Sequence, residues 1–217
     1  MTVRGLFITV EGGEGVGKST NMAYLEKELV GHGVDLLVTR EPGGSALGER
    51  LRQLLLAVDA EAIDPMAELL LVFAARAQHI TTRIEPALAA GKWVLCDRFT
   101  DATYAYQCGG RGIDRGAVSV LEKLVQGDLR PDCTLLLDAP VSIGMARAQG
   151  RGELDRFERE ELAFFERVRA TYLELAEASS GRYRIIDASQ SLANVQRQLL
   201  KVCNELTACW AVRHPEP

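Results

Sequence analysis

A strand-length apolar run followed by a glycine-rich turn constrains this chain more than any other feature. Leu6 to Val10 is apolar or β-branched, and the turn that follows reads Gly12-Gly13-Glu14-Gly15-Val16-Gly17-Lys18-Ser19. In a Gly-x-x-x-x-Gly-Lys-Ser turn, backbone N–H groups surround a phosphate, and the next helix presents the positive end of its dipole. Lys18 would neutralise the β and γ oxygens, and the Ser19 hydroxyl would ligate Mg²⁺. The sequence therefore predicts a P-loop that binds a purine nucleoside triphosphate with magnesium.

Short apolar runs alternate with longer segments of helical period along the rest of the chain. Helical spacing of apolar residues is found in segments such as 20–30, 47–58, 66–89 and 162–178. Strands alternating with helices long enough to cross over indicate a parallel sheet. We therefore predict an α/β, P-loop NTPase-type fold with a five-stranded parallel sheet covered by helices on both faces. The predicted strands are 6–10, 34–39, 93–96, 134–137 and 183–186.

One domain is expected over residues 1–217, because the sequence shows no internal repeat, low-complexity linker or break in composition. The segment from about 149 to 159 differs from its surroundings. It is polar and charged and is interrupted by Gly150 and Gly152. We interpret this segment as a short lid that closes over the site.

Composition and charge bound the cellular setting and the partners. No apolar run reaches the roughly 18 residues of a membrane span, and the N-terminus lacks the apolar block of a signal peptide. The five cysteines form no Cys-x-x-Cys pair, which favours a reducing compartment and argues against structural zinc. The net charge of −5 argues against a long nucleic-acid groove. We expect a cytoplasmic protein that binds neither a membrane nor nucleic acid.

Arginines next to Gly, Pro or Asp suggest a second anion site. Arg40 precedes Glu-Pro-Gly-Gly, Arg98 follows Asp97 at the end of a predicted strand, and Arg52 and Arg76 lie on predicted helices. Ligands of open α/β sheets bind at the carboxyl ends of the strands, and arginine binds phosphate with two parallel hydrogen bonds. The chain also lacks an Asn-Lys-x-Asp guanine reader after its late strands. The pattern predicts a second phosphate beside the first.

Several motifs together resemble bacterial thymidylate kinase, a family of P-loop nucleoside monophosphate kinases. Besides the P-loop they are Thr39-Arg-Glu-Pro-Gly-Gly44, Asp97-Arg-Phe99, Tyr104-Ala-Tyr-Gln107 and Arg151-Gly-Glu-Leu-Asp-Arg156, and the resemblance runs from about Leu6 to Leu200. It implies phosphorylation of dTMP to dTDP with ATP and Mg²⁺, a step in dTTP synthesis. It also implies a homodimer.

The resemblance also implies roles for single residues. ATP would bind at the P-loop residues 12–19 and Thr20. Mg²⁺ would be held by Ser19 and Asp97. Catalysis would rest on Lys18, Asp97, Arg98 and two arginines of the lid, Arg151 and Arg156. Some relatives carry an arginine at the position of Gly15, and its absence here leaves the lid arginines to meet the γ-phosphoryl charge.

On the acceptor side, the resemblance implies that Arg52 and Arg98 bind the dTMP phosphate, with Arg40 nearby, and that Glu14 approaches the 3′-hydroxyl. Tyr106 would lie beneath the sugar and leave no room for a 2′-hydroxyl. The base would be read by Arg76, Thr103 and Gln107. The stacking aromatic expected four residues before Arg76 is replaced by Val72, so Phe73, one residue later, is the candidate stacking ring.

Two alternatives remain at this point. One is another P-loop nucleotide or deoxynucleoside kinase, although a nucleoside kinase needs fewer arginines at the acceptor. The other is a noncatalytic nucleotide-binding protein, which the presence of Lys18, Ser19, Asp97 and Arg98 together disfavours.

Overall fold

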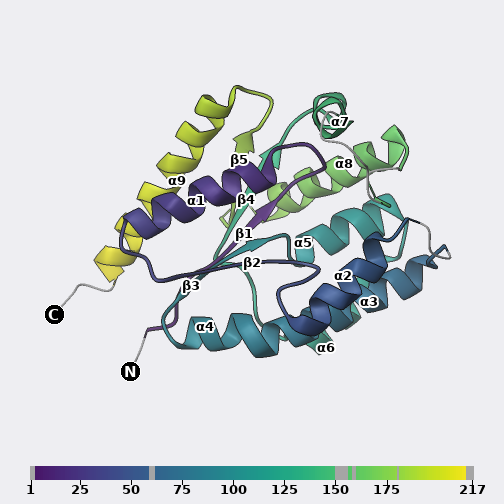
Figure 1. Cartoon of the computed structure of the whole chain (residues 1–217), viewed down its shortest axis with the longest axis horizontal. Helices are drawn as coiled ribbons and strands as arrows, with labels where there is room; N and C mark the ends of the chain where they lie inside the picture. Colours follow the sequence, from purple (N-terminus) through teal and green to yellow (C-terminus); the bar gives the residue numbers. More distant parts are fainter. Residues whose placement is uncertain (1–2, 59–61, 150–155, 158–159, 180, 214–217) are drawn as a thin grey trace.

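A single parallel sheet forms the centre of the computed structural model, which describes residues 3–58, 62–149, 156–157, 160–179 and 181–213. Within these residues the sheet has five strands in the order β2-β3-β1-β4-β5 (Figure 1). The predicted fold class is confirmed, and the strand bounds move by one or two residues. The strands are β1 (Phe7–Glu11), β2 (Leu36–Arg40), β3 (Trp93–Asp97), β4 (Cys133–Asp138) and β5 (Tyr183–Asp187).

The register of the sheet brings the predicted site segments to one edge. Val10 at the end of β1 lies opposite Asp97 at the end of β3, and Asp97 in turn lies opposite Arg40 at the end of β2. All the pairings are parallel, so the carboxyl ends of the strands meet at the same edge. The P-loop leaves β1 in the middle of this edge.

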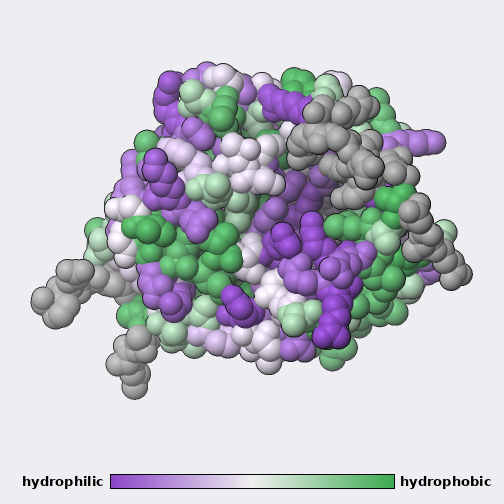
Figure 2. Space-filling view, viewed as in Figure 1, coloured by the Kyte–Doolittle hydropathy of each residue, from purple (hydrophilic) through white to green (hydrophobic). Residues whose placement is uncertain are grey.

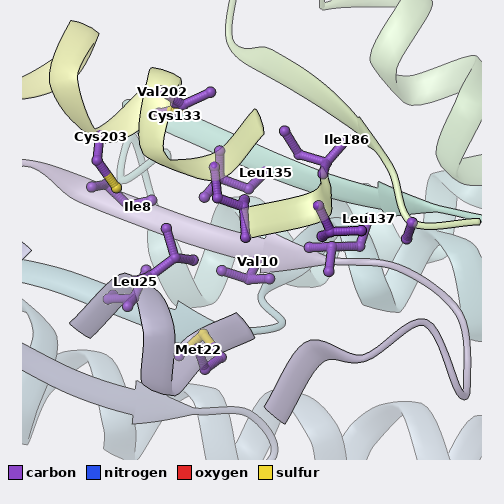
Figure 3. Packing of buried hydrophobic residues seen from close by; sticks show 14 of the residues in the cluster. Ile8, Val10, Met22, Leu25, Cys133, Leu135, Leu137, Ile186, Val202 and Cys203 are labelled. Atoms are coloured by element: carbon purple, nitrogen blue, oxygen red, sulfur yellow. The ribbon is translucent and has the colours of Figure 1, made fainter. Parts of the chain in front are cut away.

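Two helices, α1 (Lys18–Gly31) and α9 (Leu192–Arg213), cover one face of the sheet (Figure 1). Alternate residues of a strand point to opposite faces, so Ile8 and Val10 face α1 and α9, whereas Phe7 packs on the other side. Figure 3 shows the resulting core, in which side chains from β1 and β4 meet those of both helices. Its labelled members include Ile8, Val10, Leu135, Leu137, Met22, Leu25 and Val202.

Helices on the other side of the sheet pack against Phe7, Val94 and Leu136. The remaining elements are α2 (Ala46–Leu56), α3 (Pro65–His79), η1 (Ile80–Ile84), α4 (Glu85–Ala89), α5 (Thr100–Thr103), η2 (Tyr104–Gly110), α6 (Arg115–Gln126), α7 (Val141–Gln149) and α8 (Leu162–Ala178), where η marks a π-helical turn. The prediction that helices cover both faces is confirmed.

The predicted continuous helix over 66–89 is wrong in detail. The chain forms α3, then the π-helical turn η1, then α4, which has Pro86 in its first turn. Proline has no N–H to donate to the preceding turn, and its ring clashes with the carbonyl four residues earlier. A wider π-helical turn avoids this clash while the chain continues in the same direction.

Two further expectations can be compared with the structure. In the described part of the chain, no helix has the length and apolar character needed to cross a membrane. The five cysteines are free thiols, of which four are buried and Cys209 is exposed. Of the expected lid, Gln149 at the end of α7 and the pair Arg156 and Phe157 are described, whereas residues 150–155, Arg151 among them, and 158–159 lie outside the described residues.

Candidate active site

The P-loop joins β1 to α1, and its backbone turns sharply at three glycines. Gly12, Gly15 and Gly17 have φ values of 140°, 69° and 89°, which side chains rarely allow. The helix begins at Lys18, whose ammonium donates to the carbonyls of Gly12 at 3.1 Å and Gly13 at 2.7 Å. Burial lowers the pKa of Lys18, and the nearby Arg98 lowers it further. The Lys18 ammonium group is thus held inside the P-loop.

Gly15 lies in direct backbone contact with Gly144 of α7. A Cβ added to Gly15 would come 1.7 Å from the Gly144 carbonyl oxygen, and one added to Gly144 would come 2.4 Å from the carbonyl oxygen of Glu14. Real Cβ contacts shorter than 3.0 Å essentially never occur. An arginine at residue 15, or any other side chain there, therefore does not fit this backbone.

Arg98 links the end of β3 to the P-loop. Its φ of 67° places a non-glycine residue in the left-handed region. The guanidinium donates to the Gly12 carbonyl at 3.1 Å and to Glu14 Oε1 at 2.5 Å, and it lies 4.6 Å from the centre of the Tyr106 ring. The Tyr106 hydroxyl donates to the same Glu14 oxygen at 2.7 Å. Glu14, Arg98 and Tyr106 therefore form one cluster at the rim of the P-loop.

A cavity of about 250 Å³ opens beside this cluster. Figure 2 shows hydrophilic residues gathered in a hollow near the centre of this face of the molecule. The cavity runs from the P-loop to the face of α3 and brings together most residues that the sequence predicted for the site. These lining residues are Glu14, Gly15, Gly17, Lys18, Ser19, Arg52, Arg76, Asp97, Arg98, Thr103, Tyr106 and Gln107.

At the far end of the cavity, Arg76 of α3 is fixed by two hydrogen bonds. Its Nε donates to Glu41 Oε2 at 2.7 Å and its Nη2 donates to Thr103 Oγ1 at 3.0 Å. The side chain is only 1% exposed, and its Nη1 has no partner among the residues that the structure describes. A buried donor without a partner is costly. The geometry therefore leaves this nitrogen available to a ligand with an acceptor atom.

Arg156 lies on the same side of the cavity as α3. Its Nε donates to the Leu55 carbonyl at 2.8 Å and its Nη2 to Glu68 Oε2 at 2.5 Å. The predicted contact of Arg156 with a γ-phosphoryl group stays a prediction. For that contact, Arg156 would have to give up its hydrogen bonds to Leu55 and Glu68.

Comparisons with known proteins add to this geometry. Residues 10–199 match the family described as thymidylate kinase. The chain belongs to the thymidylate kinase family. It is 61% identical over 202 residues to the thymidylate kinase of Pseudomonas syringae pv. tomato, which covers 93% of this chain and 96% of that protein. It is 54% identical to the thymidylate kinase of Alcanivorax borkumensis, with 94% and 98% covered.

A solved structure supports the same family. The crystal structure of thymidylate kinase from Ehrlichia chaffeensis superposes with a TM-score of 0.73 at 33% identity, and it covers 92% of this chain and 98% of that one. The matched family and the matched fold therefore agree.

Within this candidate site, the expectation for Phe73 has to be corrected, because Phe73 does not line the cavity. Val72 lines the cavity, whereas Phe73 is 2% exposed and packs with Leu69, Cys108 and Val118. Successive residues of a helix differ by ~100° in direction, so the neighbour of a cavity residue points elsewhere. The Phe73 ring instead contacts Arg76, whose guanidinium carbon lies 4.9 Å from the ring centre.

Arg40 and Arg52, the two arginines before α3 that were predicted near the acceptor phosphate, lie in different surroundings. Arg52 lines the cavity and donates to the Pro42 carbonyl at 3.1 Å. Burial lowers its pKa, and Arg40 and Arg98 lower it further, which indicates a locally positive potential. Arg40 itself does not line this cavity. It is exposed, pairs with Glu49 at 2.8 Å, and faces a groove that shares Ser19 and Asp97 with the cavity.

Sequence reasoning missed the buried carboxylates that hold these side chains. Glu41 and Glu68 are 4% and 0% exposed, and each accepts from side chains of the site. The signal for Glu68 was present, because Glu68, Val72 and Arg76 follow one another at intervals of four and so share one face of α3. Tyr172, which donates to Glu11 at 2.9 Å, had no such signal.

The oxygen atoms near Lys18 fit a hard cation. Asp97 Oδ1 is buried and has no hydrogen-bond partner in the described part of the chain, and Ser19 is exposed at the start of α1. Both residues line the cavity. Carboxylate and hydroxyl oxygens, with water and phosphate, are the ligands that Mg²⁺ prefers. The described residues contain no cluster of three or more His, Cys, Asp or Glu that could hold a metal by itself.

Proposed function

We propose that Lys18, Asp97 and Arg98 carry out the reaction that belongs to this family, in which ATP and dTMP give ADP and dTDP. The chain is an ATP-dependent dTMP kinase. The observation that carries the assignment of residues is that the P-loop and the arginines of the acceptor side line one cavity. The phosphoryl donor ATP and the phosphoryl acceptor dTMP can therefore bind next to each other in the same cavity.

On the donor side, the P-loop and Thr20 would bind ATP, and Ser19 and Asp97 would hold Mg²⁺. When bound, Mg²⁺ neutralises charge on the β- and γ-phosphate oxygens. Lys18 would move from the Gly12 and Gly13 carbonyls to phosphate oxygens, which are stronger acceptors. The unpartnered Asp97 Oδ1 supports the assignment of the metal.

On the acceptor side, Arg52 and Arg98 would bind the dTMP phosphate, with Arg40 as a more distant positive charge. Phosphoryl transfer has a loose, in-line transition state, so its catalysis rests on positioning and charge stabilisation. The attacking phosphate oxygen is already anionic at neutral pH, so no general base is required. Arg98 would align this oxygen, because its guanidinium contacts both the P-loop and the cavity.

The nucleoside would lie between the Glu14 cluster and α3. Glu14 would meet the 3′-hydroxyl, and the Tyr106 ring would occupy the space of a 2′-hydroxyl. Arg76 and Gln107 would read the base, and Thr103 would act with Arg76, to which it is hydrogen-bonded. Val72, which lines this wall of the cavity, would take the place of a stacking ring.

The lid arginines, Arg151 and Arg156, would supply the charge that the P-loop lacks at Gly15. Support comes from the contact between Gly15 and Gly144, which excludes a side chain at residue 15. Arg156 would have to leave Glu68 and Leu55 to reach the γ-phosphoryl group. With this assignment, every residue that we propose for the reaction belongs to the one expected domain.

A homodimer is the proposed assembly, and exposed apolar side chains on α2, α3 and α6 support it. Large apolar side chains rarely gather on a surface that stays in water. The free thiols support a reducing, cytoplasmic compartment. The exposed side chains are Leu47, Leu54, Met66, Leu70, Val120 and Leu124.

ADP release with a panel of nucleoside monophosphates tests the proposal. We expect the highest kcat/KM with dTMP and a weaker one with dUMP, because one methyl group in an apolar pocket is worth about 1–3 kcal/mol. A variant Lys18→Ala should abolish release with every acceptor. A higher kcat/KM with dCMP, GMP or a nucleoside than with dTMP would contradict the assignment and favour another P-loop nucleotide or deoxynucleoside kinase.

A further inference from the structure

The Glu68 carboxylate lies at the centre of a buried cluster behind the cavity. Both of its oxygens accept hydrogen bonds. Oε1 accepts from Gln107 Nε2 at 3.0 Å and from Arg111 Nε at 3.3 Å, and Oε2 accepts from Arg156 Nη2 at 2.5 Å and from Arg111 Nη2 at 3.4 Å. The side chain is 0% exposed. Glu68 therefore joins α3, η2 and the described end of the lid.

Gln107 is the one member of this cluster that carries both a donor and an acceptor at its tip. A carboxylate paired with two guanidinium groups only accepts, so Gln107 has to turn its NH₂ group towards Glu68. No donor among the described residues reaches Gln107 Oε1. Because Gln107 lines the cavity, this oxygen is the atom that remains for a ligand.

The opposite orientation of the amide is costly. It would bring Gln107 Oε1 against Glu68 Oε1, so that two acceptors would face each other in a site where Gln107 is 3% exposed. A buried acceptor without a donor loses most of its hydration energy. Glu68 therefore fixes the orientation of the Gln107 amide. A glutamine side chain alone allows two orientations, which differ by the exchange of its nitrogen and oxygen.

We propose that Glu68 is a positioning residue for base selection: by fixing the amide of Gln107, it presents an acceptor to the base and so selects a ring with an N3–H donor. Thymine and uracil carry this donor, whereas N3 of cytosine is an acceptor and would face a second acceptor. The inference rests on the proposed function, in which Gln107 reads the base. It adds that the reading depends on a residue one layer behind the cavity.

Arg111 keeps the carboxylate in place, because its Nε and Nη2 donate to both oxygens of Glu68. Arg111 also pairs with Glu160 at 2.5 Å and stacks on Phe164, with its guanidinium carbon 5.0 Å from the ring centre. Arg156 stacks in the same way on Phe157, at 4.4 Å, and Phe157 lines the cavity. Glu68 is thus held by Arg111 and cannot turn with Gln107, also when Arg156 leaves it as the proposed function requires.

The variant Glu68→Gln tests this role, because it keeps the size of the side chain but can donate as well as accept. Either orientation of Gln107 then finds a partner. We expect the ratio of kcat/KM for dTMP over dCMP to fall about 10- to 100-fold, while the ratio of dTMP over dUMP stays unchanged. A merely structural role would lower the values for all acceptors together. An unchanged ratio of dTMP over dCMP in the folded variant overturns the proposal.

A second pair of variants decides the matter if Glu68→Gln does not fold. Gln107→Glu places two carboxylates against each other, and the double variant with Glu68→Gln restores one donor and one negative charge. The acceptor oxygen at residue 107 is then held towards the base again. A carboxylate at residue 107 presents only acceptors, so Gln107→Glu should keep the selection against dCMP but lower kcat/KM for dTMP, because two buried carboxylates repel each other. We expect the double variant to recover that kcat/KM while still selecting dTMP over dCMP, and failure to recover it overturns the proposal.

Glu122→Gln is the matched control, because Glu122 accepts from the Tyr104 hydroxyl and pairs with Arg130 away from the cavity. It should leave both ratios unchanged. The parent enzyme separates this inference from the proposed function. If the parent prefers dCMP, the proposed function fails. If the parent selects dTMP and the variants at residue 68 do so equally, only the role of Glu68 fails.

Discussion

The contact between Gly15 and Gly144 can be tested by adding one methyl group on either side. In Gly15→Ala the new Cβ would start 1.7 Å from the Gly144 oxygen, and since contacts below 3.0 Å essentially never occur, the P-loop and α7 must separate by at least 1.3 Å. In Gly144→Ala the corresponding distance is 2.4 Å, so the required shift is at least 0.6 Å.

The expected loss of stability follows from these two distances and from the backbone angle. Gly15 has a φ of 69°, where a side chain costs roughly 1–2 kcal/mol, and overpacking adds about 1–3 kcal/mol. Gly15→Ala should therefore lose about 2–5 kcal/mol, which for a chain of this length lowers Tm by roughly 4–20 °C. Gly144→Ala lacks the strained angle, so it should lose about 1–3 kcal/mol.

Thermal unfolding without nucleotide is the assay, with Gly13→Ala as the matched control in the same loop. A Cβ on Gly13 meets nothing within 4 Å, so its Tm should stay close to that of the parent. The kinase assay adds a second readout, since a misplacement of about 1 Å can cost 10²-fold in rate. If Gly144→Ala melts with the parent and Gly15→Ala loses no more than Gly13→Ala, the close packing of α7 on the P-loop is refuted.

Three further outcomes are expected. Tyr106→Ala should let ribothymidine monophosphate react while Tyr106→Phe still excludes it, and equal discrimination in Tyr106→Ala and the parent would remove Tyr106 from the sugar site. Arg156→Ala should lower kcat by about 10³-fold with little change in the KM for dTMP; a parental kcat would move catalysis off the lid. Burial and then Asp101 raise the pKa of Glu11 to about 8 from a usual 4.5, so the folded chain holds a proton that the unfolded chain releases. Stability should therefore fall as pH rises from about 4.5 through about 8, and Glu11→Gln should flatten the dependence of Tm on pH; an equally steep curve in Glu11→Gln would contradict this account.

The fold could be predicted from the sequence because the patterns that specify it are local. The five strands are short apolar runs between turns, and the P-loop fixes a strand, a turn and a helix in order. The interruption of the helix at residues 80–84 was less visible, because apolar spacing continues through η1 even though the hydrogen bonds change. Pro86 was the local sign of that change.

The site was only partly open to prediction, because long-range pairing decides which side chains meet. Arg98 and Lys18 follow from strand ends and from the P-loop, and both line the cavity. By contrast, Tyr172 reaches Glu11 across 161 positions of sequence, and no local pattern specifies such a contact. Phe73 shows a third case, in which the residue type suggested stacking but the helical angle turned the ring into the core.

The left-handed backbone of Arg98 sets stability and function against each other at a single position. Arg98 is the one non-glycine residue with positive φ in the described ranges, and such a conformation costs roughly 1–3 kcal/mol. Selection for folding alone would favour glycine here, whereas phosphoryl transfer needs the guanidinium. A screen scored by Tm alone should therefore retain Arg98→Gly more often than Arg98→Ala, although both substitutions remove the same guanidinium.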